Sequence, residues 1–80
     1  MVAFALFKEK RRGPRLAKKI GAKIRQLRLK KRLSQGDLAK KSLVIDRAYI
    51  SRLERGQVNP TLRTLERLAA LLDVSLKDFL

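Results

Sequence analysis

Apolar residues recur through residues 15–32 at the three- and four-residue spacing of an amphipathic helix, and Lys and Arg fill most of the positions between them. These apolar residues are Leu16, Ile20, Ile24 and Leu27. The spacing predicts a helix over residues 15–32 with one side packed on the rest of the chain. Gly21 lowers the helix propensity of this segment, so we expect it to allow a close contact with another helix.

A second helical pattern lies towards the end of the chain. Its apolar residues are Leu62, Leu65, Leu68, Ala69 and Leu72. Thr61 precedes them and is a suitable N-cap, because its side-chain oxygen can accept a hydrogen bond from the first helical turn. Ser75 and Asp78 repeat this capping spacing. We therefore predict a helix over residues 62–72 and a last short helix after Ser75.

Residues 34–56 have the pattern of two short helices joined by a tight turn. Ser34 and Asp37 form a capping-box-like pair at the start of the first helix. Asp46 is the N-cap candidate of the second helix, and Gly56 lies where a residue that tolerates positive φ usually ends a helix. Both helices are too short to be stable alone, so each must pack on the rest of the protein.

The second of these helices should have one packed side and one free side. Ile50 and Leu53 lie three residues apart and form the packed side. The free side then carries Arg47, Ser51, Arg52 and Arg55. An exposed helix that carries arginines and small polar groups on a compact base suits the reading of the DNA major groove.

Together these segments predict an all-α protein, a compact bundle of five helices with a helix-turn-helix and no β-sheet. The folded domain should span residues 16–80 and follow an N-terminal arm of residues 1–15 that is first apolar and then basic. Gly13-Pro14 predicts a break in the chain. Met1–Phe7 could be a frayed end, a short strand that pairs with a second copy of the chain, or an apolar flap on the domain. Residues 8–15 could reach along DNA as a basic arm.

Composition excludes several classes of function. The 80 residues include no Cys and no His, which removes disulfides, thiol and imidazole chemistry and the usual zinc sites. The acidic residues never have the spacing of paired catalytic carboxylates, and no nucleophile motif or phosphate-binding glycine loop occurs. No run approaches the roughly 18 apolar residues that a membrane span needs. We expect a cytoplasmic protein that is not an enzyme and that requires no metal, cofactor or membrane.

The net charge of +14 is the strongest compositional signal. Residues 1–33 hold 13 of the 21 Lys and Arg residues and only one of the seven acidic residues. The basic excess is therefore concentrated ahead of the two short helices. Such a field attracts a polyanion, either nucleic acid or an anionic membrane surface.

The motifs SQGDLAKK, AYISRLERG and NPTLRTLERLAALLDVSLKDFL follow one another from Ser34 to Leu80. Their order and spacing resemble the Cro and phage-repressor type of helix-turn-helix domain, the XRE-like family, over a match that begins near Lys18. The resemblance implies a lambda-repressor-like bundle that binds double-stranded operator DNA, usually as a homodimer on palindromic half-sites. It also implies transcriptional regulation in a bacterium or a phage.

The resemblance also assigns roles to side chains. Arg47 and Arg52 match positions that reach base edges, with Ala48 and Ser51 between them, although either arginine could contact phosphate alone. Gln35 begins the first motif helix, whose N-terminal amides favour a phosphate, and in the family it also braces a side chain of the recognition helix. Further contacts with the DNA backbone are expected from side chains on the recognition helix and around the next turn. These are Tyr49, Arg55, Asn59, Thr61 and Arg63.

Arg28 and Glu54 match a pair that in this family often forms an interior salt bridge between the first helix and the recognition helix. Two departures from the family pattern lie in the turn of the motif. Leu43 stands where the family often has Gly, and the chain between Ala39 and Tyr49 is one residue longer than the common pattern. We therefore expect the turn to follow a different route.

The sequence leaves further functions open. An antitoxin of a toxin–antitoxin pair would bind DNA and hold a small protein partner through the arm of residues 1–7. Restriction–modification controllers share this short architecture, and a peripheral membrane binder would use the apolar arm and the basic run. A homodimer could form through the N-terminal arm or through apolar residues near the end of the chain. These are Val74, Leu76, Phe79 and Leu80.

Overall fold

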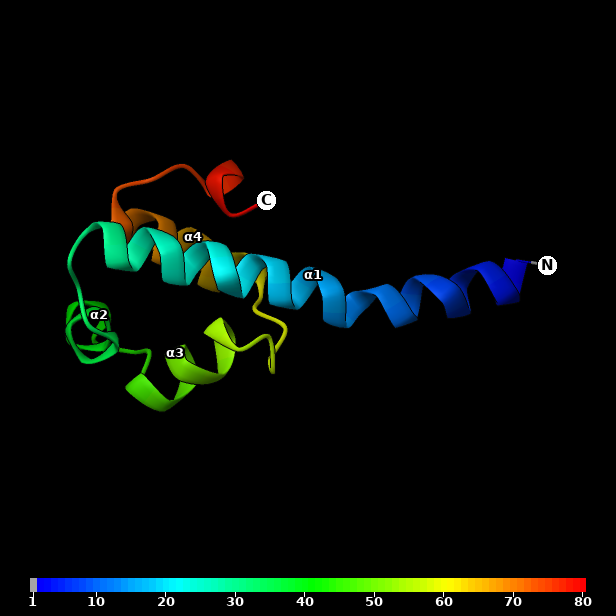
Figure 1. The fold of residues 1–80 in the computed structure, drawn as a ribbon, viewed down its shortest axis with the longest axis horizontal. Helices are drawn as coiled ribbons and strands as arrows, with labels where there is room; N and C mark the ends of the chain where they lie inside the picture. The colour runs from blue at the N-terminus through cyan, green and yellow to red at the C-terminus, as the bar shows by residue number, and fades with distance from the viewer. Residues whose placement is uncertain (1) are drawn as a thin grey trace.

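The computed structural model describes the backbone of residues 2–80 and the side chains of residues 15–80. Within that range the chain forms four α-helices and one 3-10 helix, without β-strands. They are α1 (Val2–Lys30), α2 (Gln35–Ser42), α3 (Arg47–Glu54), α4 (Leu62–Leu72) and η1 (Leu76–Phe79). The C-terminal half of α1 lies among the other helices, whereas its N-terminal half extends beyond them (Figure 1). The predicted all-α helix-turn-helix fold is confirmed.

The predicted bundle of five helices has four α-helices in the described residues, and the fifth predicted segment forms only the short 3-10 helix η1. Its backbone bonds join residues three apart, from Asp78 N–H to the Ser75 carbonyl at 2.9 Å and from Leu80 N–H to the Lys77 carbonyl at 3.1 Å. The Asp78 carboxylate also accepts a hydrogen bond from the Ser75 N–H at 2.9 Å. The capping pair therefore closes a single tight turn.

Helix α1 begins much earlier than the sequence predicts. A break at Gly13-Pro14 and a start near Arg15 were expected, but α1 is continuous from Val2 to Lys30. The alternative of a short strand at residues 2–7 is thereby contradicted. Proline removes one hydrogen bond from a helix, but Ala, Leu, Lys and Arg on both sides are strong helix formers.

Among the described residues, no helix combines the length and apolarity needed to cross a membrane.

The core lies where the C-terminal half of α1 meets the other elements. Ala17, Ile20 and Ile24 are buried on α1, whereas Leu16 is 53% exposed, so the buried stripe is rotated from the predicted one. Phe79, which the sequence offered as a dimer contact, is fully buried within the protomer and is unavailable for that role. The largest fully buried side chains are Phe79, Ile24, Leu38, Ile50, Leu53, Leu68 and Leu72.

Gly21 lies at the closest approach of α1 to α3. A Cβ atom at this position would lie 2.2 Å from the Leu53 carbonyl oxygen and 2.9 Å from that of Glu54. No side chain fits in this space, because backbone oxygens cannot move aside without displacing α3. The close helix contact expected for Gly21 is confirmed, and it sets the distance between the two helices.

Each α-helix is followed by a residue in the left-handed conformation. At three of these four positions the residue is not glycine: Arg32 has φ 60°, Leu43 has φ 64° and Asp73 has φ 55°, whereas Gly56 has φ 73°. The conformation lets the next backbone N–H groups return to the last turn of the helix. After α1, for example, the Leu33 N–H donates to the Arg28 carbonyl at 3.1 Å. Only α3 is followed by a glycine, Gly56, and so only its end could be predicted from a glycine in the sequence.

A buried ion pair joins α1 to α3. Arg28 and Glu54 are 5% and 8% exposed, and two hydrogen bonds connect them, from Nε to Oε2 at 2.6 Å and from Nη2 to Oε1 at 2.9 Å. The third guanidinium nitrogen donates to the Leu33 carbonyl at 2.8 Å. The hydrogen bonds with Glu54 raise the pKa of Arg28 above its ordinary value. Both charges are thus buried with their hydrogen-bonding groups satisfied, the condition under which a buried pair is tolerated.

Substitution of Gly21 tests the contact between α1 and α3. Gly21→Ala should lower the free energy of unfolding by about 1–3 kcal/mol, although Ala is the better helix former, because the methyl group meets backbone oxygens. Urea unfolding followed by circular dichroism measures the change. Lys23→Ala on the exposed side of α1 is the matched control, expected within about 0.5 kcal/mol of the wild type. Equal stability of the Gly21 and Lys23 variants would contradict the close contact.

Removal of Glu54 tests the ion pair. Glu54→Ala leaves the Arg28 guanidinium buried without its partner, which should cost about 3–5 kcal/mol and lower Tm markedly. Arg28→Met combined with Glu54→Leu should be less destabilised than Glu54→Ala, because no charge is then buried. Thermal melts of the wild type, Glu54→Ala and the double variant measure this order, and Glu66→Ala at an exposed position is the control. An unchanged Tm for Glu54→Ala would show that the pair contributes nothing to folding.

Candidate functional site

Helix α2 begins at a complete capping box. The Ser34 hydroxyl accepts a hydrogen bond from the Asp37 N–H, and the Asp37 carboxylate accepts one from the Ser34 N–H, both at 2.9 Å. The backbone N–H of Ser34, and then its hydroxyl, hold the pKa of Asp37 below its usual range. The predicted pair is confirmed, and it fixes Gln35 as the first residue of α2.

The turn between α2 and α3 is organised by Ser42, a buried residue that the sequence analysis did not single out. Its hydroxyl lies 2.9 Å from the Ala39 carbonyl and 2.8 Å from the Ile45 carbonyl, and it accepts from the Ile45 N–H at 2.9 Å. Leu43 takes the left-handed conformation at the expected glycine position. The longer turn is therefore accommodated by one serine and one strained residue. A serine that ends a short helix was the available sequence signal for this role.

Asp46 is the N-cap of α3, and its carboxylate accepts a hydrogen bond from the Tyr49 N–H at 2.7 Å. Its buried side consists of Ile50, Leu53 and Glu54. The predicted N-cap and the predicted apolar side are both confirmed. The packing on α1 and α2 leaves the opposite side of α3 facing away from the body of the protein (Figure 1).

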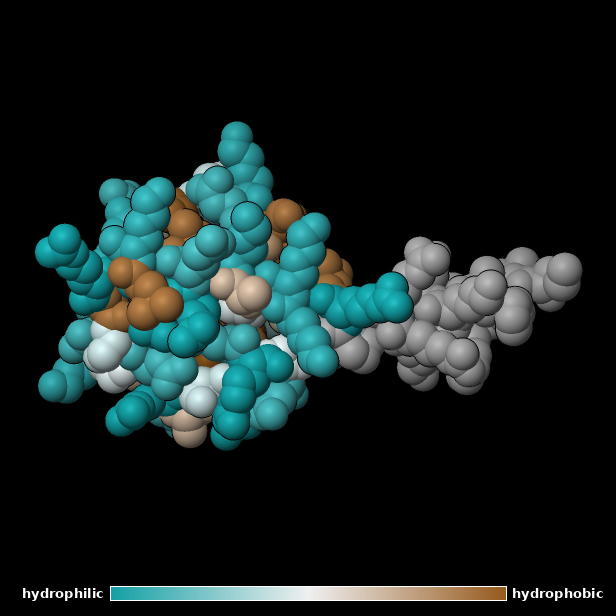
Figure 2. All heavy atoms as spheres, in the orientation of Figure 1, coloured by the Kyte–Doolittle hydropathy of each residue, from teal (hydrophilic) through white to brown (hydrophobic). Residues whose placement is uncertain are grey.

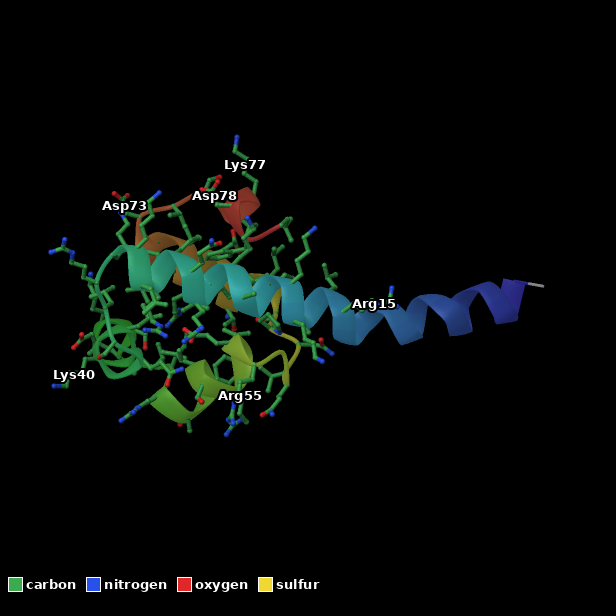
Figure 3. The ribbon with its side chains drawn as sticks, in the orientation of Figure 1. Arg15, Lys40, Arg55, Asp73, Lys77 and Asp78 are labelled. Carbon is green, nitrogen blue, oxygen red and sulfur yellow. The ribbon has the colours of Figure 1, made fainter. Side chains whose placement is uncertain are left out.

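The outward side of α3 brings together the residues expected to read bases. Arg47, Ala48 and Arg52 are exposed, and Ser51 is half-buried between them. Arg55 follows the helix, donates from Nε to the Ser51 carbonyl at 3.3 Å and points away from the protein (Figure 3). The arginines lie on one side of a short rigid helix, where they can bind a planar group with several acceptors.

Gln35 does not project freely into solvent. It is half-buried, and its Nε2 donates to Glu54 Oε1 at 3.1 Å. Glu54 thus accepts hydrogen bonds from both α1 and the start of α2. Gln35 braces a side chain of α3 in this way, while its backbone N–H lies in the first turn of α2.

The other residues expected at the DNA backbone lie around the link between α3 and α4. Asn59, Thr61 and Arg63 are exposed there. The Thr61 hydroxyl caps α4, since it accepts from the Thr64 N–H at 3.1 Å. Tyr49 is half-buried and lines a surface cavity of about 330 Å³ between the start of α3 and Thr64. The residues expected at the DNA backbone therefore lie on α3, in the link that follows it and at the start of α4.

The surface around the site is polar. In the orientation of Figure 1, hydrophilic side chains cover most of the described surface, and the apolar groups form separate spots (Figure 2). With a net charge of +14, the protein presents a positive field to any anionic partner. Large exposed apolar side chains do occur in the turn before α3, at Leu43 and Val44.

A helix-turn-helix family model matches residues 24–79 of the chain. The ImmF control region 10 kDa protein of Bacillus phage phi105 is 41% identical over 59 residues, which cover 74% of this chain and 64% of that protein. The HTH-type transcriptional regulator SinR of Bacillus subtilis (strain 168) is 42% identical over 62 residues, which cover 76% of this chain and 55% of SinR. The chain therefore spans less than two thirds of the length of these curated relatives.

A solved structure is also similar. The restriction-modification controller protein C.AhdI from Aeromonas hydrophila superposes with a TM-score of 0.76 and 39% sequence identity, over 80% of this chain and 96% of C.AhdI. The family model covers α2, α3 and α4 completely, together with the last part of α1. The protein therefore belongs to the XRE-type helix-turn-helix family.

Proposed function

We propose that this protein is a transcriptional regulator that binds double-stranded DNA at specific sequences, with α3 in the major groove. The observation that carries the proposal is the outward side of α3, where Arg47 and Arg52 are exposed while Ile50 and Leu53 anchor the helix in the core. Arginine can donate to both major-groove acceptors of guanine. Ala48 and Ser51 are small enough to let the helix approach the bases closely.

Contacts with phosphate position the helix on the duplex. Arg55, Asn59 and Arg63 are exposed at the end of α3, in the link and at the start of α4, and we assign them to one strand of the duplex. Thr61 and Tyr49 contribute hydroxyl groups, and the first turn of α2 at Gln35 contributes backbone N–H groups and the positive end of the helix dipole. Together these contacts give affinity for DNA of any sequence. The basic N-terminal half of the chain increases this affinity further.

The regulator acts as a homodimer on a palindromic operator. Two copies of α3 then occupy successive major grooves about 34–36 Å apart, so that the symmetry of the DNA matches that of the protein. Leu80 is 61% exposed, and Val74 and Leu76 are half-buried beside it, so this end of the chain offers an apolar contact between protomers. The N-terminal part of α1 is the other candidate for the dimer contact.

A second candidate function is control of a restriction–modification system. Similarity to C.AhdI over almost the whole length of that protein favours it. Both candidates use the same DNA-binding surface, and the position of the operator separates them. Selection of bound duplexes from random DNA gives the operator, and a controller's operator lies beside genes for a restriction endonuclease or its methyltransferase. Co-purification of a small partner from the native host would favour an antitoxin instead.

Base reading is tested by removing one arginine at a time. Arg52→Ala should relax the preference at one position of each half-site in the selected DNA, at a cost of about 1–3 kcal/mol for the preferred base. Arg47→Ala should act in the same way at a different position. Arg67→Ala on the exposed side of α4 is the control and should leave the selected sequence unchanged. A uniform loss of affinity over all sequences would assign Arg52 to the phosphates.

Phosphate binding is tested through salt. The logarithm of the affinity should fall linearly with the logarithm of the salt concentration, because bound Lys and Arg release counterions. Arg63→Ala should weaken binding equally for all sequences and reduce the magnitude of the slope by about one. Fluorescence anisotropy with operator and unrelated duplexes measures both effects. A slope unchanged by Arg63→Ala would place this side chain away from the backbone.

A further inference from the structure

The turn between α2 and α3 exposes two apolar side chains, Leu43 and Val44, which we call the turn patch. Leu43 is 92% exposed and Val44 is 69% exposed. Leu43 also has φ 64°, a left-handed conformation that costs a side-chain-bearing residue stability and that glycine adopts freely. Leucine at this position therefore combines backbone strain with an apolar side chain in water. Neither property helps the isolated protein to fold.

The patch lies beside the start of the recognition helix. Leu43 and Val44 border a surface hollow of about 450 Å³ that is also lined by Lys40 on α2, by Asp46 and by Arg47 on α3. Lys40 and Arg47 are both exposed. The Asp46 carboxylate accepts a hydrogen bond from the Tyr49 N–H at 2.7 Å, and Lys40 and Arg47 are the two cations beside the apolar side chains. The matching partner carries an apolar group within an anionic surface.

We infer that the turn patch contacts the C5-methyl group of a thymine at the edge of each half-site, an inference that rests on the proposed DNA binding. The thymine methyl is the apolar group that B-DNA displays in its major groove, and phosphates surround it on both sides. Lys40 and Arg47 fit those phosphates or a neighbouring base, while Leu43 and Val44 meet the methyl. The turn then adds sequence preference to that of α3.

A second copy of the chain fits the patch less well. Two side chains provide far less area than the roughly 800 Å² per partner of a stable interface. Two copies joined here would also bring Lys40 and Arg47 against the same cations of the other copy. Thymine avoids both problems, because the rest of the interface is supplied by α3 and the phosphate contacts.

The test uses deoxyuridine, which lacks only the methyl group of thymine. Each thymine of the selected operator is replaced in turn, and anisotropy gives the affinity of the wild-type protein. One thymine in each half-site, next to the base whose preference depends on Arg47, should lose roughly fourfold in affinity, the effect of burying one methyl group. The double variant Leu43→Gly, Val44→Ser, which removes every methyl group of the patch, should bind the thymine and deoxyuridine duplexes equally well.

Controls keep the outcomes distinct. Leu29→Ala, which removes an exposed leucine from α1, far from the turn in sequence, should retain the wild-type preference for thymine. Urea unfolding should show the double variant folded, because glycine relieves the strain at position 43. An operator without a methyl-sensitive thymine, or a preference that persists in the double variant, overturns the inference while DNA binding stands. Loss of a dimer in sedimentation of the double variant would assign the patch to a second copy, and absence of binding to any duplex would refute the proposed function itself.

Discussion

The carboxylate of Glu54 is the point on which the arrangement of this protein depends. It accepts hydrogen bonds from Arg28 on α1 and from Gln35 on α2, while it belongs to α3. Three helices are therefore joined at a single buried group. Because an unpaired charge at this depth would be very costly, the helices have one relative position in which all partners are satisfied. Gly21 reinforces this position, since it allows the backbones of α1 and α3 to meet.

This arrangement fixes α3 most firmly at its C-terminal end. Leu53 and Glu54 are held by α1, whereas the N-terminal end is reached through the turn and capped by Asp46. The turn at the other end is held by Ser42, because its hydroxyl binds backbone groups on both sides of the turn. The outward side of α3 consequently remains free for a ligand.

Much of this structure could be predicted from sequence because short-range chemistry determines it. The caps Ser34, Asp46 and Thr61 act on amides within their own first turns, and all three were identified correctly. The apolar side of α4 was predicted correctly at Leu65, Leu68, Ala69 and Leu72, which are buried at helical spacing, whereas Leu62 at the start of the helix is exposed. The motif order also indicated the family before any geometry was known.

The remaining features depend on contacts between distant segments. Leu16 is more apolar than Ala17, yet Ala17 is buried, because close approach of α1 to its neighbours favours the smaller side chain. The start of α1 could not be placed because Gly13-Pro14 is a strong local signal that the flanking helix formers override. Among the proposed site residues, exposure agrees with the expected roles of Arg47 and Arg52. The base contacts proposed for these two arginines depend on the sequence of the bound DNA as well as on this chain.

The separation of inward and outward residues on α3 has a consequence for evolution. Ile50, Leu53 and Glu54 hold the helix in place, and the exposed positions between them contribute little to that support. The outward residues can therefore be exchanged as a set while the scaffold stays folded. With DNA binding as proposed, a lineage of such proteins can acquire new target sites by a few substitutions on one helix, and an engineer can retarget the protein in the same way.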